Sequence, residues 1–426
     1  MRKRYRLLIF LNSFAAGVMA PVLSLALLAR GASISTVSLM LGIYSLTVIV
    51  TEFPSGVFAD LYGRKKAYAL SAALHILSYC ALLFSGTLLM LAVAMVLNGL
   101  ARAFSSGSID ALAMDEAVSN GSEVVKVSAQ ISVMESAGLA AGALAGGFLS
   151  GVGARYEGNL LVNLGVYTLL FAIAVFFVRE QPRPRAQETP ARLGNLGVQV
   201  RESLSFAAQK GTVRMLLVFS ALSGVALISI ETYWQPALLA LSPPPFVFGA
   251  VSFAGFACVV AGSKLTQALF TKHPQSGVAT ALALKALFGV CLGLLVLQRD
   301  TPLFVSVYSL VYLFLGSGSV AESALLNQQA PPERRASILS LFSFVLQLGG
   351  LLASLCGAAM SAYADYKYMW YLSGGLLLIG AGIFSLLGIK RRLRARQQTL
   401  EVVTEPDQTQ SEAINGSGDV CEQEKA

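Results

Sequence analysis

The chain is a succession of long apolar blocks separated by short polar segments. Blocks of about 20 or more apolar residues are long enough for an α-helix to cross the roughly 30 Å hydrocarbon core of a bilayer. The strand-type alternation typical of a membrane β-barrel is absent from the sequence. The blocks therefore predict twelve membrane-spanning helices. In the first half they cover 7–29, 35–58, 67–86, 88–113, 127–151 and 158–178. In the second half they cover 214–240, 246–270, 277–297, 303–327, 337–361 and 368–389.

The polar segments divide these helices into two sets of six. We predict an all-α integral membrane protein with an N-terminal bundle over 1–178 and a C-terminal bundle over 214–390. The segment 179–213 is rich in Pro, Arg, Gln and Glu and is predicted to be a linker. Residues 391–426 are polar and acidic, a composition typical of a disordered tail.

The two halves resemble each other in sequence. Residues 105–123 align with 316–334 at an offset near 211, and the same offset brings Gly138 onto Gly349. An offset near 215 sets Pro21 opposite Pro236. Three matches at nearly constant offset favour a duplication, which predicts two pseudo-symmetric bundles. Transporter folds are commonly built from such repeats, with the binding site between them.

Composition and charge agree with a membrane protein. Apolar residues make up 55% of the 426 positions and charged residues 13%, whereas a soluble domain has about 25% charged residues. The net charge of +8 comes from basic residues that flank the apolar blocks at the start, at 64–66, between 179 and 214 and at 390–396. With a cytoplasmic N-terminus all four groups face the cytoplasm, as the positive-inside rule requires. This asymmetry predicts a cytoplasmic linker and C-terminus, and it makes nucleic acid an unnecessary explanation of the charge. The cysteines have neither metal-site spacing nor a disulfide pattern.

The segment after the second predicted helix carries a specific motif. It reads Gly56-Val-Phe-Ala-Asp60-Leu-Tyr-Gly63-Arg64-Lys65-Lys66, which resembles the major facilitator superfamily signature G-x-x-x-D-[RK]-x-G-R-[RK], with a leucine at the first basic position. The resemblance covers about residues 6–390 and implies a twelve-helix transporter.

The motif residues also suggest roles of their own. Gly56 is expected to allow close helix packing, and Asp60 and Arg64 have the spacing of an ion pair on one helix. With Asp115, the resemblance implies a charge network that latches an outward-open state. The alternative is that these charges only set the membrane topology.

The fifth predicted helix contains a run of glycines at Gly138, Gly142, Gly146 and Gly147. With Ala143 it resembles the superfamily's antiporter motif G-x-x-x-G-P-x-x-G-G, except that alanine replaces the proline. Small residues at these spacings also suit any tight helix pair. Both interpretations stay open from the sequence.

Ionisable residues inside the apolar blocks are the candidate site residues, since each costs at least about 2.5–3.5 kcal/mol to insert. Glu231 is the leading candidate because it has no basic residue within one helical turn, which suits proton binding. Tyr233, Trp234 and Gln235 beside it are predicted to line a substrate cavity, with an interfacial aromatic belt as the alternative. The quinolone efflux pumps of Gram-positive bacteria carry acids on helices seven and ten, and Glu231 and Glu322 resemble that arrangement.

Three further ionisable residues belong to the candidate set. Asp110 is the repeat counterpart of Glu322, one residue out of register, and Glu135 either neutralises Arg102 or lines the cavity. His75 and Lys285 correspond at an offset of 210. Since helices three and nine usually lie outside the central cavity of this fold, structural pairing is the favoured role for His75 and Lys285.

Together these features predict a secondary active transporter, a monomer in the bacterial cytoplasmic membrane. The favoured hypothesis is proton-coupled efflux of a small lipophilic or cationic compound, with few polar residues expected in the cavity. Uptake or exchange of a metabolite, with Arg102 binding a substrate carboxylate, is the alternative within transport. A non-transporting membrane sensor is the alternative from another class. No enzyme motif is present in the sequence, and no cofactor or metal is expected; the proton gradient is the predicted energy source.

Overall fold

The structure is a computed structural model that describes residues 3–106, 108–119, 124–178, 205, 210–273, 276–329 and 335–404. Within these residues the chain is helical and contains no strand. Residues Met1–Gly380 form one compact unit and Ala381–Ala426 a second. Most of the predicted linker and the predicted tail after residue 404 lie outside the described residues and stay predictions. The prediction of disorder is wrong for residues 391–404, which continue the last helix.

The helices follow the apolar blocks closely. The first half contains α1 (Lys3–Met19), α2 (Leu23–Leu28), α3 (Ile34–Tyr62), α4 (Arg64–Leu83), α5 (Leu88–Ser105), α6 (Ser108–Ser119), α7 (Val124–Leu149), the short η1 (Ala154–Tyr156), α8 (Glu157–Ala172) and the π-helical turn η2 (Ile173–Phe177). The second half contains α10 (Gly211–Leu239), α11 (Phe246–Lys272), α12 (Gly277–Val296), α13 (Thr301–Gln329), α14 (Arg335–Tyr363) and α15 (Tyr368–Thr404). We call the end of the bundle at which α1 begins the inner end and the opposite end the outer end.

The described residues contain 11 helices long and apolar enough to cross a membrane. The first predicted span is the exception, because it is divided into α1 and α2 around Pro21. A proline has no N–H for the helix ladder, and its ring clashes with the carbonyl four residues earlier. The predicted helix over 7–29 is therefore two helices, and α1 alone has 17 residues.

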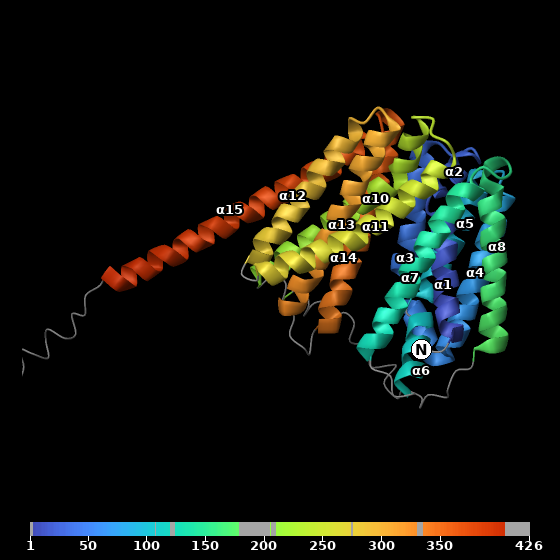
Figure 1. Cartoon of the computed structure of the whole chain (residues 1–426), viewed down its shortest axis with the longest axis horizontal. Helices are drawn as coiled ribbons and strands as arrows, with labels where there is room; N and C mark the ends of the chain where they lie inside the picture. Colours follow the sequence, from blue (N-terminus) through green and yellow to red (C-terminus); the bar gives the residue numbers. More distant parts are fainter. Residues whose placement is uncertain are drawn as a thin grey trace, which may run out of the picture. The chain divides into compact units, whose positions relative to one another are not determined.

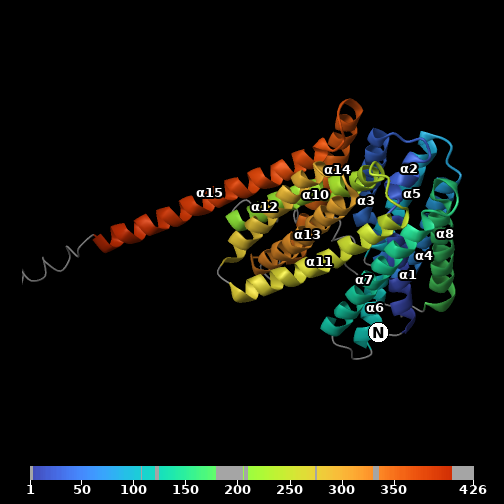
Figure 2. The same cartoon turned by 45° about the horizontal axis from the view of Figure 1, so that its top comes forward.

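Both halves use the same helix pairings. α1 packs against α7, α3 against α5 and α4 against α5 in the first half; α10 packs against α14, α11 against α13 and α12 against α13 in the second. These are corresponding pairs in the predicted repeat. Figures 1 and 2 show α1 beside α7, and α11 beside α13, from two directions. Between the halves, α7 packs against α11 and α3 against α14.

Glycines bring the backbones of the paired helices together. A Cβ atom on Gly138 of α7 would collide with the carbonyl oxygen of Phe10 in α1, and one on Gly349 of α14 would collide with that of Ala221 in α10. Both members of the second pair lie 211 positions after those of the first. The duplication inferred from the sequence is thus repeated in the packing of the structure.

A buried arginine ties the outer loops together. Arg30 is 8% exposed, and its guanidinium donates to the carbonyls of Leu82 at 2.6 Å, Ala26 at 2.9 Å and Arg155 at 2.6 Å. These carbonyls belong to the ends of α2, α4 and the turn before α8. One side chain therefore links three backbone carbonyls at or near helix ends, where carbonyls lack the full set of intrahelical partners.

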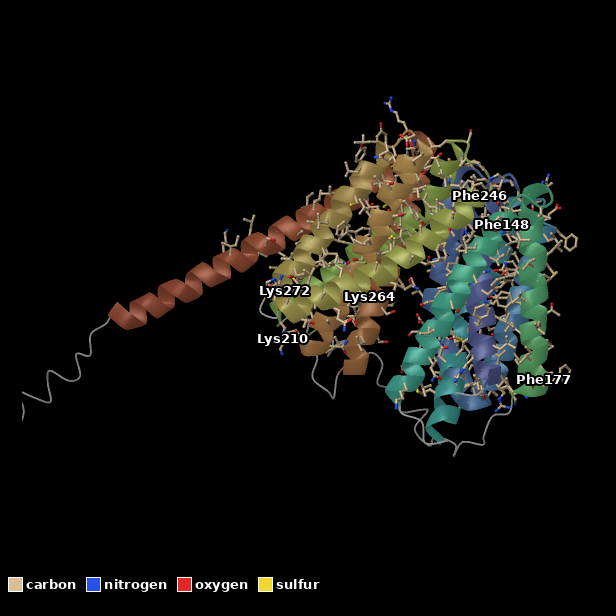
Figure 3. The ribbon with its side chains drawn as sticks, in the orientation of Figure 1. Phe148, Phe177, Lys210, Phe246, Lys264 and Lys272 are labelled. Atoms are coloured by element: carbon tan, nitrogen blue, oxygen red, sulfur yellow. The ribbon has the colours of Figure 1, made fainter. Side chains whose placement is uncertain are left out.

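Large apolar side chains project from the outside of the described helices. Phe148, Phe177 and Phe246 are 72%, 66% and 53% exposed, and Figure 3 labels them on α7, η2 and α11. In water such exposure would be unfavourable. In a bilayer these side chains meet lipid, as the composition predicts.

Candidate functional site

A cavity of about 660 Å³ lies among helices of both halves. Its walls come mostly from α1, α3, α5, α6 and α7, with Ile228, Glu231 and Gln235 contributed by α10. Most of the lining residues are polar or charged, among them Asn12, Ser13, Ser24, Tyr44, Ser45, His75, Tyr79, Asn98, Arg102, Ser105, Ser106, Asp110, Glu135, Ser136, Tyr167, Glu231 and Gln235. The expectation of few polar cavity residues is wrong. Scattered along the sequence these residues look like isolated exceptions, and only the packing collects them on one surface.

Glu231 lies in the wall of this cavity, as its burial without a basic neighbour suggested. One carboxylate oxygen accepts a hydrogen bond from the Tyr312 hydroxyl of α13. The ring of Tyr312 packs against that of Tyr308 at a centroid distance of 4.6 Å, and the Tyr308 ring lies 5.1 Å from that of Trp234. The carboxylate therefore stands between an open cavity on one side and an aromatic cluster on the other.

The three residues that follow Glu231 closely point in different directions. Gln235 lines the cavity, donates to the Ala20 carbonyl at 2.8 Å and accepts from the Ser24 amide at 2.9 Å. Tyr233 and Trp234 are each 1% exposed and are not among the cavity-lining residues. The prediction that all three line the cavity is wrong for these two, because successive helix residues are turned by about 100° and cannot share one face.

Arg102, Asp110 and Glu135 gather on the first-half wall. All three line the cavity, and Arg102 interacts electrostatically with both acids. Its side chain is exposed to the cavity and interacts electrostatically with the Tyr44 hydroxyl. Among the described residues no carboxylate lies within ion-pairing distance of Arg102. The guanidinium therefore lies near two carboxylates without forming an ion pair with either of them.

Glu322 has a different environment from its predicted partner Glu231. Its carboxylate forms an ion pair with Lys285 Nζ at 2.9 Å, and Ser223 accepts from the same ammonium group at 2.6 Å. Glu322 and Lys285 are 3% and 2% exposed, and neither is among the residues that line the cavity. The structure thus separates Glu231, open to the cavity, from Glu322, which is enclosed with its own cation.

His75 belongs to the cavity, contrary to the expectation for the third helix. Its ring stacks on Tyr167 at a centroid distance of 4.1 Å and on Tyr79 at 6.2 Å, and all three residues line the cavity. The Nδ1 atom is buried and has no hydrogen-bond partner. No sequence signal separates His75 from its counterpart Lys285, because neither α4 nor α12 contains an acid.

The motif after α3 forms the turn between α3 and α4. Gly63 has a φ angle of 101°, in the left-handed region that favours glycine. Because the helix ends at Tyr62 and the next begins at Arg64, Asp60 and Arg64 do not share one helix, and the single-helix spacing argument fails. Lys65 Nζ donates to the carbonyl of Val175 at 2.9 Å.

Two further parts of the motif differ in what the structure describes. A Cβ atom on Gly56 would meet nothing within 4 Å, so the close packing predicted there is not present. The side chains of Asp60 and Asp115 are outside the described part of the chain, and the charge network stays a prediction.

The glycine run of α7 serves helix packing on two sides. Cβ atoms on Gly138, Gly142 and Gly146 would collide with backbone atoms of α1. Gly147 instead faces the other half, where a Cβ atom would come within 2.5 Å of the Cα of Gly249 in α11. The run therefore joins α7 to its own bundle and to the opposite one, and nothing in these contacts identifies a coupling role.

The halves are closed against each other at the outer end. Besides the Gly147–Gly249 contact, the Tyr233 hydroxyl donates to Ser38 at 3.0 Å and Ser38 donates to the carbonyl of Ser354 at 3.0 Å. Within the described residues, every recorded hydrogen bond between the halves lies at this end. Cavity-lining residues such as Asp110 extend the cavity away from this seal, toward the inner end.

The described residues contain no group of three or more His, Cys, Asp or Glu side chains that could hold a metal ion. The cavity can instead bind an organic molecule through carboxylates, one guanidinium, amides, hydroxyls and aromatic faces. Its volume lies within the roughly 300–1,000 Å³ of small-molecule sites.

Comparison with known proteins gives a consistent result. The sequence model of the Major Facilitator Superfamily matches residues 7–321 and 277–411. The chain is 24% identical to the MFS-type transporter YxaM of Bacillus subtilis over 389 residues, covering 88% of this chain and 93% of that protein. It is also 24% identical to the multi-drug resistance efflux pump PmrA of Streptococcus pneumoniae, over 80% of this chain and 83% of that one.

Solved structures show the same fold at low sequence identity. The nucleoside transporter NupG superimposes with a TM-score of 0.72 at 15% identity, covering 90% of this chain and 98% of its own. A bacterial homologue of the iron transporter ferroportin, in its inward-facing state, gives a TM-score of 0.70 at 16% identity, covering 89% and 97%.

Proposed function

Because the chain belongs to the Major Facilitator Superfamily of membrane transporters, we propose that it exports a small positively charged compound in exchange for protons. The observation that carries the proposal is the position of Glu231. Its carboxyl group lies in the cavity wall, and among the residues that the structure describes its partner is the Tyr312 hydroxyl and not a cation. Such a group can hold either a proton or a cationic substrate, and this competition is what an exchanger needs.

The exchange follows from alternating access of one site. In the conformation described here the outer end is sealed, so the cavity receives substrate from the inner end. A deprotonated Glu231 binds the cation, and the halves then reopen at the outer end. There a proton displaces the cation from the carboxylate. The protein with neutral Glu231 then returns to the conformation that opens at the inner end, where the proton is released. The Tyr312 hydroxyl keeps the carboxyl group oriented in both forms.

The polar cavity bears on the choice of substrate. Asp110, Glu135 and Glu231 place three carboxyl groups on its walls against one guanidinium, which supports a cation over an anion. Similarity to the efflux pump PmrA supports export, and the membrane orientation stays a prediction from the basic residues.

Arg102 favours a second candidate function, uptake or exchange of a metabolite that carries a carboxylate. Its guanidinium is exposed in the cavity without an ion-pair partner among the described residues. A carrier of this kind would need no carboxylate that cycles protons, which separates it from the exchanger experimentally.

The test is transport of phenethyltrimethylammonium, a cation of fixed charge, into proteoliposomes with an acidic interior. The wild type should accumulate the cation in proportion to the pH gradient, and Glu231→Gln should lose that accumulation because an amide cannot cycle a proton. Asp300→Asn is the matched control: Asp300 lies before α13, where its carboxylate accepts from the Leu303 amide, and asparagine caps a helix equally well. Wild-type accumulation with unchanged pH dependence in Glu231→Gln would refute the assignment.

A further inference from the structure

The wall of the cavity that belongs to the first half has an unusual combination of groups. Arg102 is exposed, lines the cavity and interacts electrostatically with Tyr44. His75 is 6% exposed, lines the same cavity and has a buried Nδ1 atom with no partner. The ring of His75 therefore has one nitrogen enclosed by protein, while the residue still contributes to the cavity wall beside Arg102.

Comparison of the two repeats shows what is special about this wall. In the second half Lys285 occupies the position equivalent to His75, and its ammonium is closed into an ion pair with Glu322 at 2.9 Å. In the first half the equivalent acid, Asp110, lies on the cavity surface, where it interacts electrostatically with Arg102. In the second half these two positions form a buried ion pair, whereas in the first half they line the cavity.

From these contacts we infer that Arg102 and His75 form a subsite for a carboxylate group of the substrate. The guanidinium offers paired N–H donors that match a carboxylate, and the imidazole of His75, which lines the same cavity, supplies one ring N–H in its neutral form. The stacked rings of His75, Tyr79 and Tyr167 hold the imidazole in place. Asp110 and Glu135 lower the net charge of this wall without occupying the guanidinium.

This inference rests on the proposed function and narrows its substrate class. Glu231, on the second-half wall, would bind a positively charged group, while Arg102 and His75 would bind a negatively charged one. A molecule that satisfies both walls is a small zwitterion of the amino-acid type. Because the two charges of the zwitterion would be bound by opposite halves, substrate binding would also draw the two halves together.

The test uses three probes that share one phenyl ring: phenylalanine, phenethylamine, which lacks the carboxylate, and 3-phenylpropionate, which lacks the amine. Their binding to the detergent-purified full chain is measured by thermal shift titration without any pH gradient. The zwitterion should bind roughly tenfold or more tightly than the cation, the ratio expected for hydrogen bonds to a charged group. Arg102→Gln should abolish this preference and leave the affinity for phenethylamine within about threefold.

His75→Phe separates the subsite from a structural role. Phenylalanine keeps the stack on Tyr167 and removes the nitrogen, so the affinity for the zwitterion should fall several-fold while the ligand-free melting temperature stays close to that of the wild type. The inference is overturned if phenethylamine binds as tightly as phenylalanine, if no probe binds, or if Arg102→Gln weakens both amines equally. Any of these results can coexist with proton exchange through Glu231, so the two proposals fail independently.

Discussion

Replacing Lys285 by methionine removes the cation that neutralises Glu322 inside the second half. The ion pair is 2.9 Å long, both side chains are at most 3% exposed, and the other polar neighbour of Glu322 is the Ser223 hydroxyl at 3.5 Å. At this burial the carboxylate is almost inaccessible to solvent, and one hydroxyl cannot compensate a full charge. Breaking a buried pair by removing one partner costs about 3–5 kcal/mol, and we expect a loss of stability of this size for Lys285→Met and for Glu322→Leu.

The double variant decides whether the pair acts as a unit. With both charges replaced by apolar groups no buried charge is left, so Lys285→Met/Glu322→Leu should recover most of the loss, because such replacements are often neutral. The measurement is reversible denaturant unfolding in detergent, arranged as a double-mutant cycle. If the losses of the single variants simply add in the double variant, the two residues are not coupled and the structural assignment of this pair is wrong.

Three further outcomes follow from the packing. Arg30→Lys should destabilise the protein by about 1–3 kcal/mol, measured as a lower melting temperature, because one ammonium cannot serve three separated carbonyls. Gly147→Ala should weaken the outer seal, since its Cβ would come within 2.5 Å of Gly249; spin-label distances between the halves should lengthen, while Gly165→Ala, where a Cβ meets nothing within 4 Å, should leave them unchanged. Gly63→Ala should cost about 1 kcal/mol of unfolding free energy, because φ of 101° is unfavourable with a Cβ; an unchanged denaturation midpoint would contradict this.

The sequence by itself determined the helices and their duplication. Spanning length and hydropathy depend on consecutive residues, so the twelve apolar blocks could be placed without tertiary information. The offset of 211 that relates Gly138 to Gly349 also reappears in their packing partners. The first block shows the limit of this reasoning, since its composition is continuous while Pro21 divides it into α1 and α2.

Only the tertiary structure decided which polar residues face the cavity. Glu231 and Glu322 look alike in sequence, as carboxylates within apolar helices. In the structure Glu322 is ion-paired with Lys285, whereas Glu231 lines the cavity. His75, expected outside the cavity, was placed in its wall by the same kind of long-range contact. The physical reason is that the free-energy cost of inserting a charged residue depends on that residue alone. The interactions that offset this cost depend on neighbours from distant helices. Burial of a charge could therefore be predicted from the sequence, but the choice between a partner, a cavity and a ligand could not.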